Sequence, residues 1–385
     1  MKKIVFVLTT YEIGGVSTVA KNLLDAWVPD RFKITLVVEK LAARHNPVDA
    51  RVNIIDLGMT AKKDILSKAT NMIRHISAMR KAIISESPDA VISFGAQANC
   101  LTLLALFRSA PGRPRIVISE HSEFMFIRTV TKGLKYTALK NIYRILMSFL
   151  YHRADAIVAV SEVVGQRVRK LPFVDRDKVK VIYNPVNADK IAGFCVRAAQ
   201  GPRGQDGLPR IGAVSRLSQE KGIHFLIEAF KLLLDKIDAR LIVIGDGPEK
   251  AHLEEMARSL GAESKIAFTG WAEDPIKYMA TMDIFVLPSI FEGLPNSILE
   301  AMACGVPVIA SDLAGGVREI ITNRVNGILI APSSAPAISE AVYDLLTDRE
   351  KMQRIARKGL ETVKRFDIGL ISREYDDLLF GNKKV

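Results

Sequence analysis

Short apolar runs rich in β-branched residues alternate along this chain with longer segments whose apolar positions recur every three or four residues. Continuous apolar runs are typical of strands buried on both faces, and the longer pattern is typical of amphipathic helices. Strands that are separated by helices predict a parallel sheet with helices on both faces. In the first half the predicted strands are Lys3–Thr9, Ile34–Val38, Val52–Leu57, Ala90–Phe94, Arg115–Ser119, Ala156–Val160 and Val179–Tyr183, with helices over Ser17–Trp27, Lys62–Glu86 and Gly133–Tyr151.

The alternation of predicted strands and helices is interrupted between residues 184 and 210. The stretch RAAQGPRGQDGLPR in this interval is rich in Gly, Pro, Arg and Gln, which predicts an exposed linker. A second series of strands then follows. Its members are Arg210–Val214, Arg240–Ile244, Lys265–Thr269, Asp283–Leu287, Pro307–Ala310 and Gly327–Ile330. At 385 residues the chain is too long for one core. We expect a doubly wound domain over 1–185, a linker over 186–209 and a second domain over 210–365, with a helix at about 366–380 packing back on the first domain.

Composition narrows the class of protein. A hydrophobic content of 49% with 25% charged residues is that of a folded globular protein. The three cysteines, Cys100, Cys195 and Cys304, are far apart and show no metal-ligand spacing, which favours a reducing compartment. The apolar run after Lys2 and Lys3 is only about seven residues long and precedes no cleavage site, and no stretch approaches the roughly 20 apolar residues of a membrane span. We therefore expect a cytoplasmic protein.

Positive charge is concentrated in the first half. Residues 1–190 carry 30 Lys and Arg against 16 Asp and Glu, whereas the rest of the chain is nearly neutral. Segment 124–154 has no acidic residue, and its cations, which include Lys132, Lys135, Lys140 and Arg144, alternate with apolar residues. Such a segment can lie on an anionic membrane or hold an anionic acceptor, and it can equally be a core helix with a solvated basic face.

A glycine pair stands between the first predicted strand and the helix that follows it. Gly14 and Gly15 let the backbone approach a ligand closely, and the helix N-terminus offers N–H groups to an anion. An ordinary turn with Ser17 as the N-cap explains the same residues. Ligands of open α/β sheets bind at the carboxyl ends of the strands, so two domains facing each other would hold a ligand in the cleft between them.

Two cations follow the first strand of the second domain in the stretch AVSRLSQEKG. Arg216 and Lys221 can converge on one diphosphate there, with Arg as a bidentate clamp and Lys as a point charge. A solvated surface loop is the plainer interpretation. The turn Gly245–Pro248 after the next strand carries a weak signal, because many strand-to-helix turns look alike.

The stretch LPSIFEGLPNSILEAMACGVPVIAS carries the most specific pattern. Glu292 lies in a loop after a strand, and Glu300 lies about one turn into a helix that starts at Pro295 or Asn296. Two carboxylates can accept hydrogen bonds from sugar and ribose hydroxyls, while the amides between them approach a phosphate. Solvent-exposed charges explain the same two residues. In IVISEHSEF, His121 follows a strand and can contact a sugar or handle a hydroxyl proton, although a lone histidine is more often structural.

In this order the second-domain motifs, SRLSQEKG, IGDGP and FEGLPNSILEAMACGVPVIAS, resemble family 4 of the retaining glycosyltransferases, the glycogen-synthase-like and mannosyltransferase-like enzymes. IGGVS and SEHSE are similar to the phosphate loop and the histidine segment of that family. The resemblance implies an α/β fold of two doubly wound Rossmann-like domains that face each other across a cleft, the GT-B type. It covers the whole chain, most strongly over residues 210–330.

The resemblance also implies the roles of individual residues. Arg216, Lys221 and the backbone at Gly14 and Gly15 would bind the donor diphosphate, and Glu300 would hold the ribose. Glu292 would contact the donor sugar, with the amides of Gly293 and Leu294 near the sugar and distal phosphate. His121 would lie near the anomeric carbon. The resemblance implies a mechanism without a metal ion, so no metal or other cofactor is expected.

The expected reaction moves a hexose or N-acetylhexosamine from a nucleotide sugar, UDP-linked by analogy with the family, to a lipid-linked oligosaccharide or surface-polysaccharide acceptor. The enzyme would sit peripherally on the inner face of the cytoplasmic membrane, with an anionic lipid-linked partner and no nucleic acid. Two other classes stay open at this point. A sugar-nucleotide epimerase of similar fold would convert its donor without an acceptor, and a nonenzymatic two-domain binding protein would do no chemistry.

Overall fold

The computed structural model describes residues 1–12, 14–27, 31–43, 45, 47–59, 65–107, 112–121, 144–198 and 207–381. These residues form two compact units, Met1–Pro185 with Ile368–Val385 and Val186–Asp367. Each of the thirteen strands predicted from the sequence overlaps an observed strand, so the strand predictions are confirmed. The agreement follows from burial on both faces, because continuous apolar runs leave little ambiguity between strand and loop.

Unit 1 is built on a seven-stranded parallel sheet of order β3-β2-β1-β4-β5-β6-β7. Its strands are β1 Lys2–Tyr11, β2 Phe32–Leu41, β3 Asn53–Asp56, β4 Ala90–Phe94, β5 Arg115–Glu120, β6 Ala156–Ala159 and β7 Val179–Val181. The helices are α1 Gly15–Trp27, α2 Ile65–Ser85, α3 Ala96–Ala105, α5 Glu162–Arg169 and α14 Ile368–Phe380, with a 3-10 turn η2 at Arg176–Lys178. Residues 144–151 are also helical.

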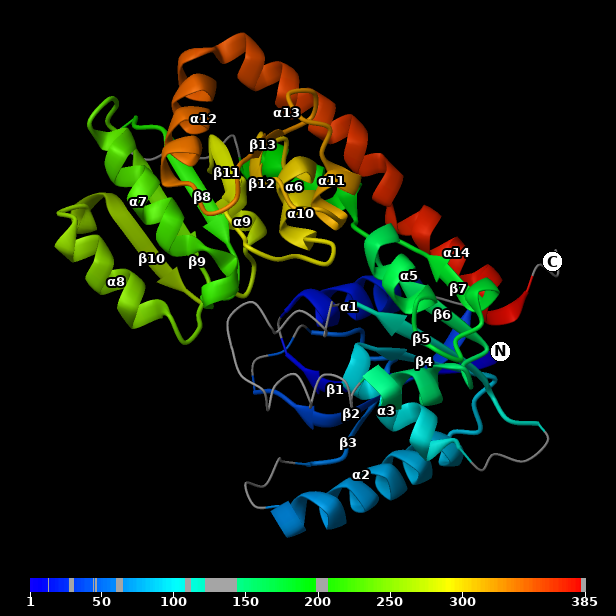
Figure 1. Cartoon of the computed structure of the whole chain (residues 1–385). Coiled ribbons are helices and arrows are strands. Elements are labelled where there is room, and N and C mark those ends of the chain that lie inside the picture. Colours follow the sequence, from blue (N-terminus) through cyan, green and yellow to red (C-terminus); the bar gives the residue numbers. More distant parts are fainter. Residues whose placement is uncertain are drawn as a thin grey trace. The chain divides into compact units, whose positions relative to one another are not determined.

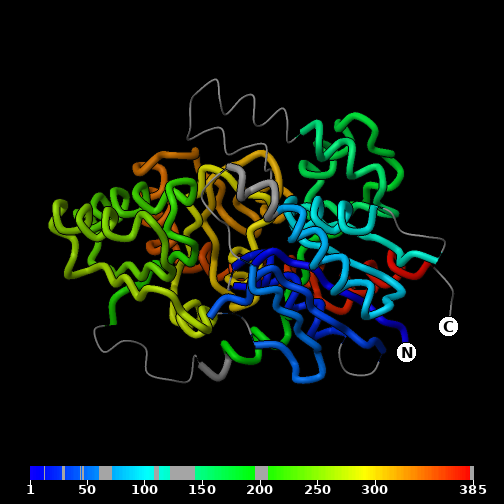
Figure 2. Tube along the Cα trace, turned by 90° about the horizontal axis from the view of Figure 1, so that it is seen from below, coloured from blue at the N-terminus to red at the C-terminus, as the bar shows by residue number. Residues whose placement is uncertain are grey.

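The last helix of the chain, α14, belongs to unit 1 (Figures 1 and 2). The Tyr375 ring meets the Trp27 ring of α1 edge-on at a centroid distance of 6.2 Å. Lys2 Nζ lies 3.9 Å from the centroid of the Phe380 ring, and Arg115 Nε donates to the Leu378 carbonyl at 2.7 Å. Helix α14 therefore completes the core that also contains Ile4, Phe6 and Leu8 of β1 and the buried face of α1.

Unit 2 has a six-stranded parallel sheet of order β10-β9-β8-β11-β12-β13. Its strands are β8 Arg210–Val214, β9 Arg240–Ile244, β10 Ile266–Gly270, β11 Ile284–Leu287, β12 Val308–Ser311 and β13 Ile328–Ile330. Its helices are α6 Ala188–Ala198, α7 Ile223–Leu234, α8 Lys250–Ser259, α9 Ile276–Met279, α10 Asn296–Ala303, α11 Gly316–Ile320, α12 Ala335–Thr347 and α13 Arg349–Val363. Short 3-10 turns are η3 Gln219–Lys221, η4 Glu263–Lys265 and η5 Lys364–Phe366.

The segment interpreted as a linker contains a helix in its first part. Helix α6 packs against α9 and α10, and Cys195 on its inner face is buried. Ile191, Phe194 and Cys195 recur at helical spacing, and this short apolar face accounts for the packing. The Gly- and Pro-rich part of the segment, residues 199–206, lies outside the described residues.

The strand order reverses once in each sheet, between β1 and β4 in unit 1 and between β8 and β11 in unit 2 (Figure 1). At such a point the loops that follow the two neighbouring strands run to opposite faces of the sheet and leave a crevice at its carboxyl edge. The glycine pair Gly14-Gly15 follows β1. Arg216 follows β8 and Glu292 follows β11, so these three candidate sites lie at the two switch points.

Candidate functional site

The loops after β8 and β11 are joined at the switch point of unit 2. Gly222, between η3 and α7, has a left-handed φ of +65°, and a Cβ there would lie 2.2 Å from the Pro288 carbonyl oxygen. The amide of Ile290 donates to the carbonyl of Glu220 at 2.8 Å. Only glycine allows so close an approach of the two backbones. The Arg216–Lys221 segment is thereby held against the segment that carries Glu292.

Glu292 is fixed by two hydrogen bonds to the same oxygen. Lys221 Nζ donates to Glu292 Oε1 at 2.7 Å, and the buried Ser289 hydroxyl donates to it at 2.7 Å. The Glu292 side chain is 9% exposed and that of Lys221 is 23% exposed. A charge-assisted bond in a largely desolvated setting orients the carboxylate strongly. The lysine predicted for a diphosphate is therefore also the direct partner of the glutamate predicted for a sugar.

Arg216 is exposed beside this pair. The nearby Glu220 carboxylate accepts a hydrogen bond from the Ser218 hydroxyl at 2.6 Å. Burial acts to raise the pKa of Glu220, but hydrogen bonds from the Ser218 hydroxyl and the Glu220 backbone amide, together with the charges of Lys221 and Arg216, bring it below its ordinary value. The segment therefore holds two cations and one carboxylate, and an anion can reach the exposed Arg216 from solvent.

The motif IGDGP supports the β8 loop. Gly245 has φ +140°, and a Cβ there would lie 1.8 Å from the Ser215 carbonyl oxygen, while a Cβ on Gly247 would lie 2.2 Å from that of Leu217. The Leu217 amide donates to the Asp246 carbonyl at 2.9 Å. These glycines act first by letting the backbone pack against the segment that carries Arg216. The weak sequence signal thus has a defined structural meaning.

Helix α10 presents its N-terminus immediately after Glu292. Gly293 and Leu294 precede its Pro295 cap, and a Cβ on Gly316 would lie 2.0 Å from the Gly293 carbonyl oxygen. Glu300 stands in the second turn of α10, as predicted. Burial raises the pKa of Glu300 to about 7, and the charge of Asp274 adds to this, although the residue keeps some exposed surface. A carboxyl group that titrates near neutrality is unusual and marks a functional candidate.

In unit 1 the glycine pair opens α1. The helix begins at Gly15, so Ser17 lies inside its first turn and the N-cap interpretation of Ser17 is wrong. A Cβ built on Gly14 would meet no atom within 4 Å, and the residue is exposed. The backbone at Gly14 therefore has open space in front of it, which suits the approach of a ligand to the helix N-terminus.

His121 follows β5 directly. Ser119 Oγ lies 2.9 Å from His121 Nε2, and the imidazole ring is tilted against the Phe94 ring at a centroid distance of 5.8 Å. Burial lowers the pKa of His121 to about 3, so the ring is neutral at physiological pH. A neutral imidazole offers one donor and one acceptor nitrogen, which suits contact with hydroxyls rather than phosphate charge.

Known proteins that are similar to this chain are glycosyltransferases. Residues 13–190 match Glycosyltransferase Family 4, and residues 200–362 match the glycosyl transferases group 1. The chain belongs to family 4 of the glycosyltransferases. It is 34% identical to an uncharacterized glycosyltransferase of Methanocaldococcus jannaschii over 53% of this chain and 55% of that protein.

Full-length similarity is lower but extends from end to end. A Campylobacter jejuni enzyme named N-acetylgalactosamine-N,N'-diacetylbacillosaminyl-diphospho-undecaprenol 4-alpha-N-acetylgalactosaminyltransferase is 24% identical over 99% of this chain and 100% of its own. Among solved structures, Anabaena HepE in complex with UDP and glucose has a TM-score of 0.77 at 21% identity, covering 98% of this chain and 99% of its own. WaaG, a lipopolysaccharide glycosyltransferase, has a TM-score of 0.77 at 15% identity, covering 98% and 100%. The glycosyltransferase thus has the GT-B fold.

The basic segment of the glycosyltransferase is only partly described. Lys132, Lys135 and Lys140 lie outside the described residues, whereas Arg144 is exposed at the start of the helix 144–151. That helix buries Met147 and Leu150 and exposes three apolar side chains. These are Ile145 at 65%, Leu146 at 40% and Phe149 at 56%. Among the described residues, no helix combines the length and apolar character needed to span a bilayer.

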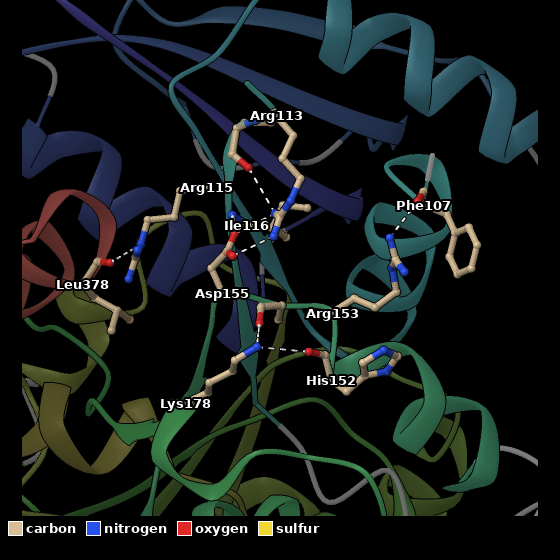
Figure 3. Close-up of polar contacts among 11 residues, drawn as sticks. Phe107, Arg113, Arg115, Ile116, His152, Arg153, Asp155, Lys178 and Leu378 are labelled. Carbon is tan, nitrogen blue, oxygen red and sulfur yellow. Dashed lines mark hydrogen bonds and ion pairs between the residues drawn. The ribbon is translucent and has the colours of Figure 1, made fainter. Parts of the chain in front are cut away.

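Several cations of unit 1 serve structural contacts (Figure 3). Arg113 makes two bonds of 2.7 Å to Asp155, and Lys178 Nζ donates to the carbonyls of His152 and Ala154. Arg153 donates to the Phe107 carbonyl at 2.6 Å and lies over the Phe107 ring. The positive charge of this half of the glycosyltransferase is therefore not all available to a partner.

Three residues that contact or influence the candidate site residues carry no recognisable signal in the sequence. Ser289 binds Glu292, Asp274 acts on Glu300, and Ser119 binds His121. Ser289 and Ser119 are small hydroxyl residues at strand ends, as many loop residues are. Asp274 is 26 positions from the glutamate that it affects, and only the folded sheet brings the two together.

Proposed function

We propose that this glycosyltransferase transfers a hexose or N-acetylhexosamine, with retention of anomeric configuration and without a metal ion, from a UDP-sugar to a lipid-linked oligosaccharide or surface-polysaccharide acceptor. The observation that carries the proposal is the Lys221–Glu292–Ser289 cluster beside the N-terminus of α10. It places a cation, an oriented carboxylate and helix amides within one short stretch of the carboxyl edge of unit 2.

Each group in that cluster suits one part of a nucleotide sugar. Arg216, Lys221 and the α10 N-terminus provide positive potential for a diphosphate, the task that Mg²⁺ performs in other enzymes. Both bonds to Glu292 fall on Oε1, so Oε2 can accept hydrogen bonds from donor-sugar hydroxyls, next to the amides of Gly293 and Leu294. Glu300 accepts the ribose hydroxyls.

Unit 1 supplies the remaining donor contacts and the acceptor in this proposal. The backbone at Gly14, which has open space in front of it, contacts the diphosphate together with the backbone of Gly15, and the neutral His121 hydrogen-bonds the sugar near its anomeric carbon. The acceptor hydroxyl attacks that carbon on the face from which the diphosphate leaves. The bond from carbon to phosphate oxygen breaks as the bond to the acceptor oxygen forms, and the hydroxyl proton passes to the departing phosphate.

Two similarities support the choice of substrates. The full-length Campylobacter relative is named for a diphospho-undecaprenol acceptor, and HepE was solved with UDP and with UDP-glucose. The acid-free segment 124–154 and the exposed Ile145 and Phe149 fit a peripheral position on the anionic inner face of the cytoplasmic membrane.

The test is a panel of UDP- and GDP-sugars with membrane lipid extract, in which nucleotide release and product mass are scored together. We expect release of UDP that depends on lipid, and a lipid product heavier by one sugar. The ¹H coupling constant at the new anomeric centre reports retention. Inversion, or conversion of the donor to an epimer without any acceptor, contradicts the proposal.

A further inference from the structure

A row of buried polar groups stands behind His121. The carbonyl oxygen of Ser119 accepts the Gly95 amide at 2.8 Å and Asn99 Nδ2 at 3.0 Å, so the end of β5 is fixed on the side of α3. The hydroxyl of the same serine lies 2.9 Å from His121 Nε2. Ser119 is fully buried. The His121 ring is therefore hydrogen-bonded to a buried side chain that has little conformational freedom.

The last helix of unit 1 reaches the same serine. Tyr375 OH lies 3.4 Å from Ser119 Oγ, 256 positions away in the sequence, and Tyr375 is fully buried. The ring is locked against Trp27 in the core of unit 1. A buried tyrosine hydroxyl normally finds a hydrogen-bond partner. Among the described residues, Ser119 Oγ is the acceptor available to it.

The proton positions in the row of hydrogen bonds from Tyr375 through Ser119 to His121 can be assigned by counting donors and acceptors. A serine hydroxyl has one proton to donate and two lone pairs. Burial raises the pKa of Tyr375, so its phenol keeps its proton, and that proton points to Ser119 Oγ. The serine proton is then directed to His121 Nε2. An imidazole nitrogen that accepts a hydrogen bond is unprotonated, and in a neutral ring the other nitrogen, Nδ1, carries the hydrogen.

We propose that Ser119 and Tyr375 are positioning residues that hold His121 as the Nδ1–H tautomer, so that the ring offers a single hydrogen-bond donor to an oxygen of the donor sugar. The role of the tautomer in catalysis rests on the proposed function, whereas the tautomer itself does not. The 3.4 Å contact is longer than an ordinary O–H···O bond, so Tyr375 contributes less than Ser119. The C-terminal helix is thereby linked to a group proposed for the chemistry.

The tautomer is tested without any substrate. Long-range ¹H–¹⁵N spectra of the full chain labelled on histidine separate protonated from unprotonated ring nitrogens. His121 is assigned among the six histidines by the signal that is lost in His121→Gln. We expect an unprotonated Nε2 and a protonated Nδ1 in the wild type. We expect Ser119→Ala to shift this population, and Tyr375→Phe to shift it less. A protonated Nε2 in the wild type overturns the proposal.

Tyr11→Phe is the matched control. Tyr11 is also fully buried in the core of unit 1, and its hydroxyl has no hydrogen-bond partner among the described residues. The Tyr11→Phe substitution therefore removes a buried hydroxyl group that does not contact Ser119. We expect the His121 signal to be unchanged in this variant. An equal shift in Tyr11→Phe and Tyr375→Phe means that general loosening of the core moves the histidine, and that result contradicts the proposal.

A double-mutant cycle tests the catalytic consequence. Removing one hydrogen bond typically changes an equilibrium by about 2- to 10-fold, so we expect kcat to fall by about that factor in Ser119→Ala and by about 2-fold in Tyr375→Phe, with little change in donor KM. Neither substitution should lower kcat further in a His121→Ala background. Equal losses in both backgrounds show that the two residues act elsewhere. If the wild type transfers no sugar from any donor, the proposed function fails, and the tautomer is still decided by the spectra.

Discussion

Lys221 Nζ and Glu292 Oε1 lie 2.7 Å apart although the two residues are 71 positions apart in the sequence. The contact exists because β8 and β11 are neighbours in the sheet and the loops after them meet at Gly222 and Pro288. One ion pair therefore joins the cation proposed for the diphosphate to the carboxylate proposed for the sugar. Removing either partner disturbs both tasks.

We expect Glu292→Gln to reduce transfer by about 10²–10³ at saturating donor, because the amide cannot replace a carboxylate that is oriented by Lys221 and accepts sugar hydroxyls. The fold should persist, since the amide oxygen still accepts from Ser289. The measurement is kcat together with thermal unfolding, and the control is Glu340→Gln on the exposed face of α12. Near-wild-type turnover of Glu292→Gln removes this residue from the site.

Arg216→Ala and Lys221→Ala should each slow transfer by about 10²–10³, because charge on the leaving diphosphate grows as the glycosidic bond breaks. Lys221→Ala should be the more damaging, since it also leaves Glu292 without its cation. Lys231→Ala on α7 is the control, because the Lys231 side chain is 43% exposed and pairs with Asp235 one turn away. Equal effects of all three substitutions point to general electrostatics instead of diphosphate binding.

A chelator should leave the reaction rate unchanged if Arg216, Lys221 and the α10 N-terminus neutralise the diphosphate. The assay compares initial rates after EDTA treatment with rates after addition of Mg²⁺ or Mn²⁺. Strict dependence of the chemical step on either ion contradicts the metal-independent mechanism. Loss of activity in EDTA that any divalent ion restores has the same meaning.

The raised pKa of Glu300 predicts that the stability of the folded protein depends on pH. Its pKa is raised from 4.5 to about 7 in the folded protein, so the folded state keeps a proton that the unfolded chain releases. Folding is therefore penalised progressively as pH rises from about 4.5 to about 7, and the full penalty remains above that range. Glu300→Gln should raise the melting temperature relative to wild type at pH 8 and have less effect at pH 5. A constant difference between the two proteins at both pH values contradicts the assignment.

Neutralising Lys132, Lys135, Lys140 and Arg144 together should reduce binding to anionic liposomes and raise the KM for a lipid-linked acceptor, with donor KM nearly unchanged. Each cation near an anionic surface contributes on the order of 1 kcal/mol, and salt screens it. Cosedimentation at low and high ionic strength measures the effect. Wild-type binding by this variant, with equal use of lipid-linked and water-soluble acceptors, contradicts the membrane-acceptor proposal.

The exposed apolar side chains of the same segment allow a second membrane test. Phe149→Ser should weaken liposome binding at both low and high salt, because insertion of an aromatic ring does not depend on screening. Phe173→Ser is the control, since Phe173 is 75% exposed in unit 1 but lies outside the basic segment. Equal loss in both variants shows that the effect is not specific to the segment.

The sequence by itself determined the strands, the two sheets and the identity of most candidate residues. Buried parallel strands must be apolar on both faces, so each can be recognised from a short apolar run such as Lys3–Thr9 or Asp283–Leu287. The order of motifs along the chain was likewise sufficient to recognise the family. Helix α6 was missed because Ile191, Phe194 and Cys195 form a short apolar face next to a Gly- and Pro-rich stretch that dominated its interpretation.

Only the tertiary structure decided which of these residues act together. Strand order and helix packing bring Lys221 to Glu292 and let the IGDGP motif support the Arg216 loop. They also bring Tyr375 to Ser119, the serine that contacts His121. The pKa of Glu300 depends in the same way on burial and on Asp274. A sequence window records propensity over a few residues. Desolvation and hydrogen bonds depend on distances between residues that are remote along the chain, and folding alone sets those distances.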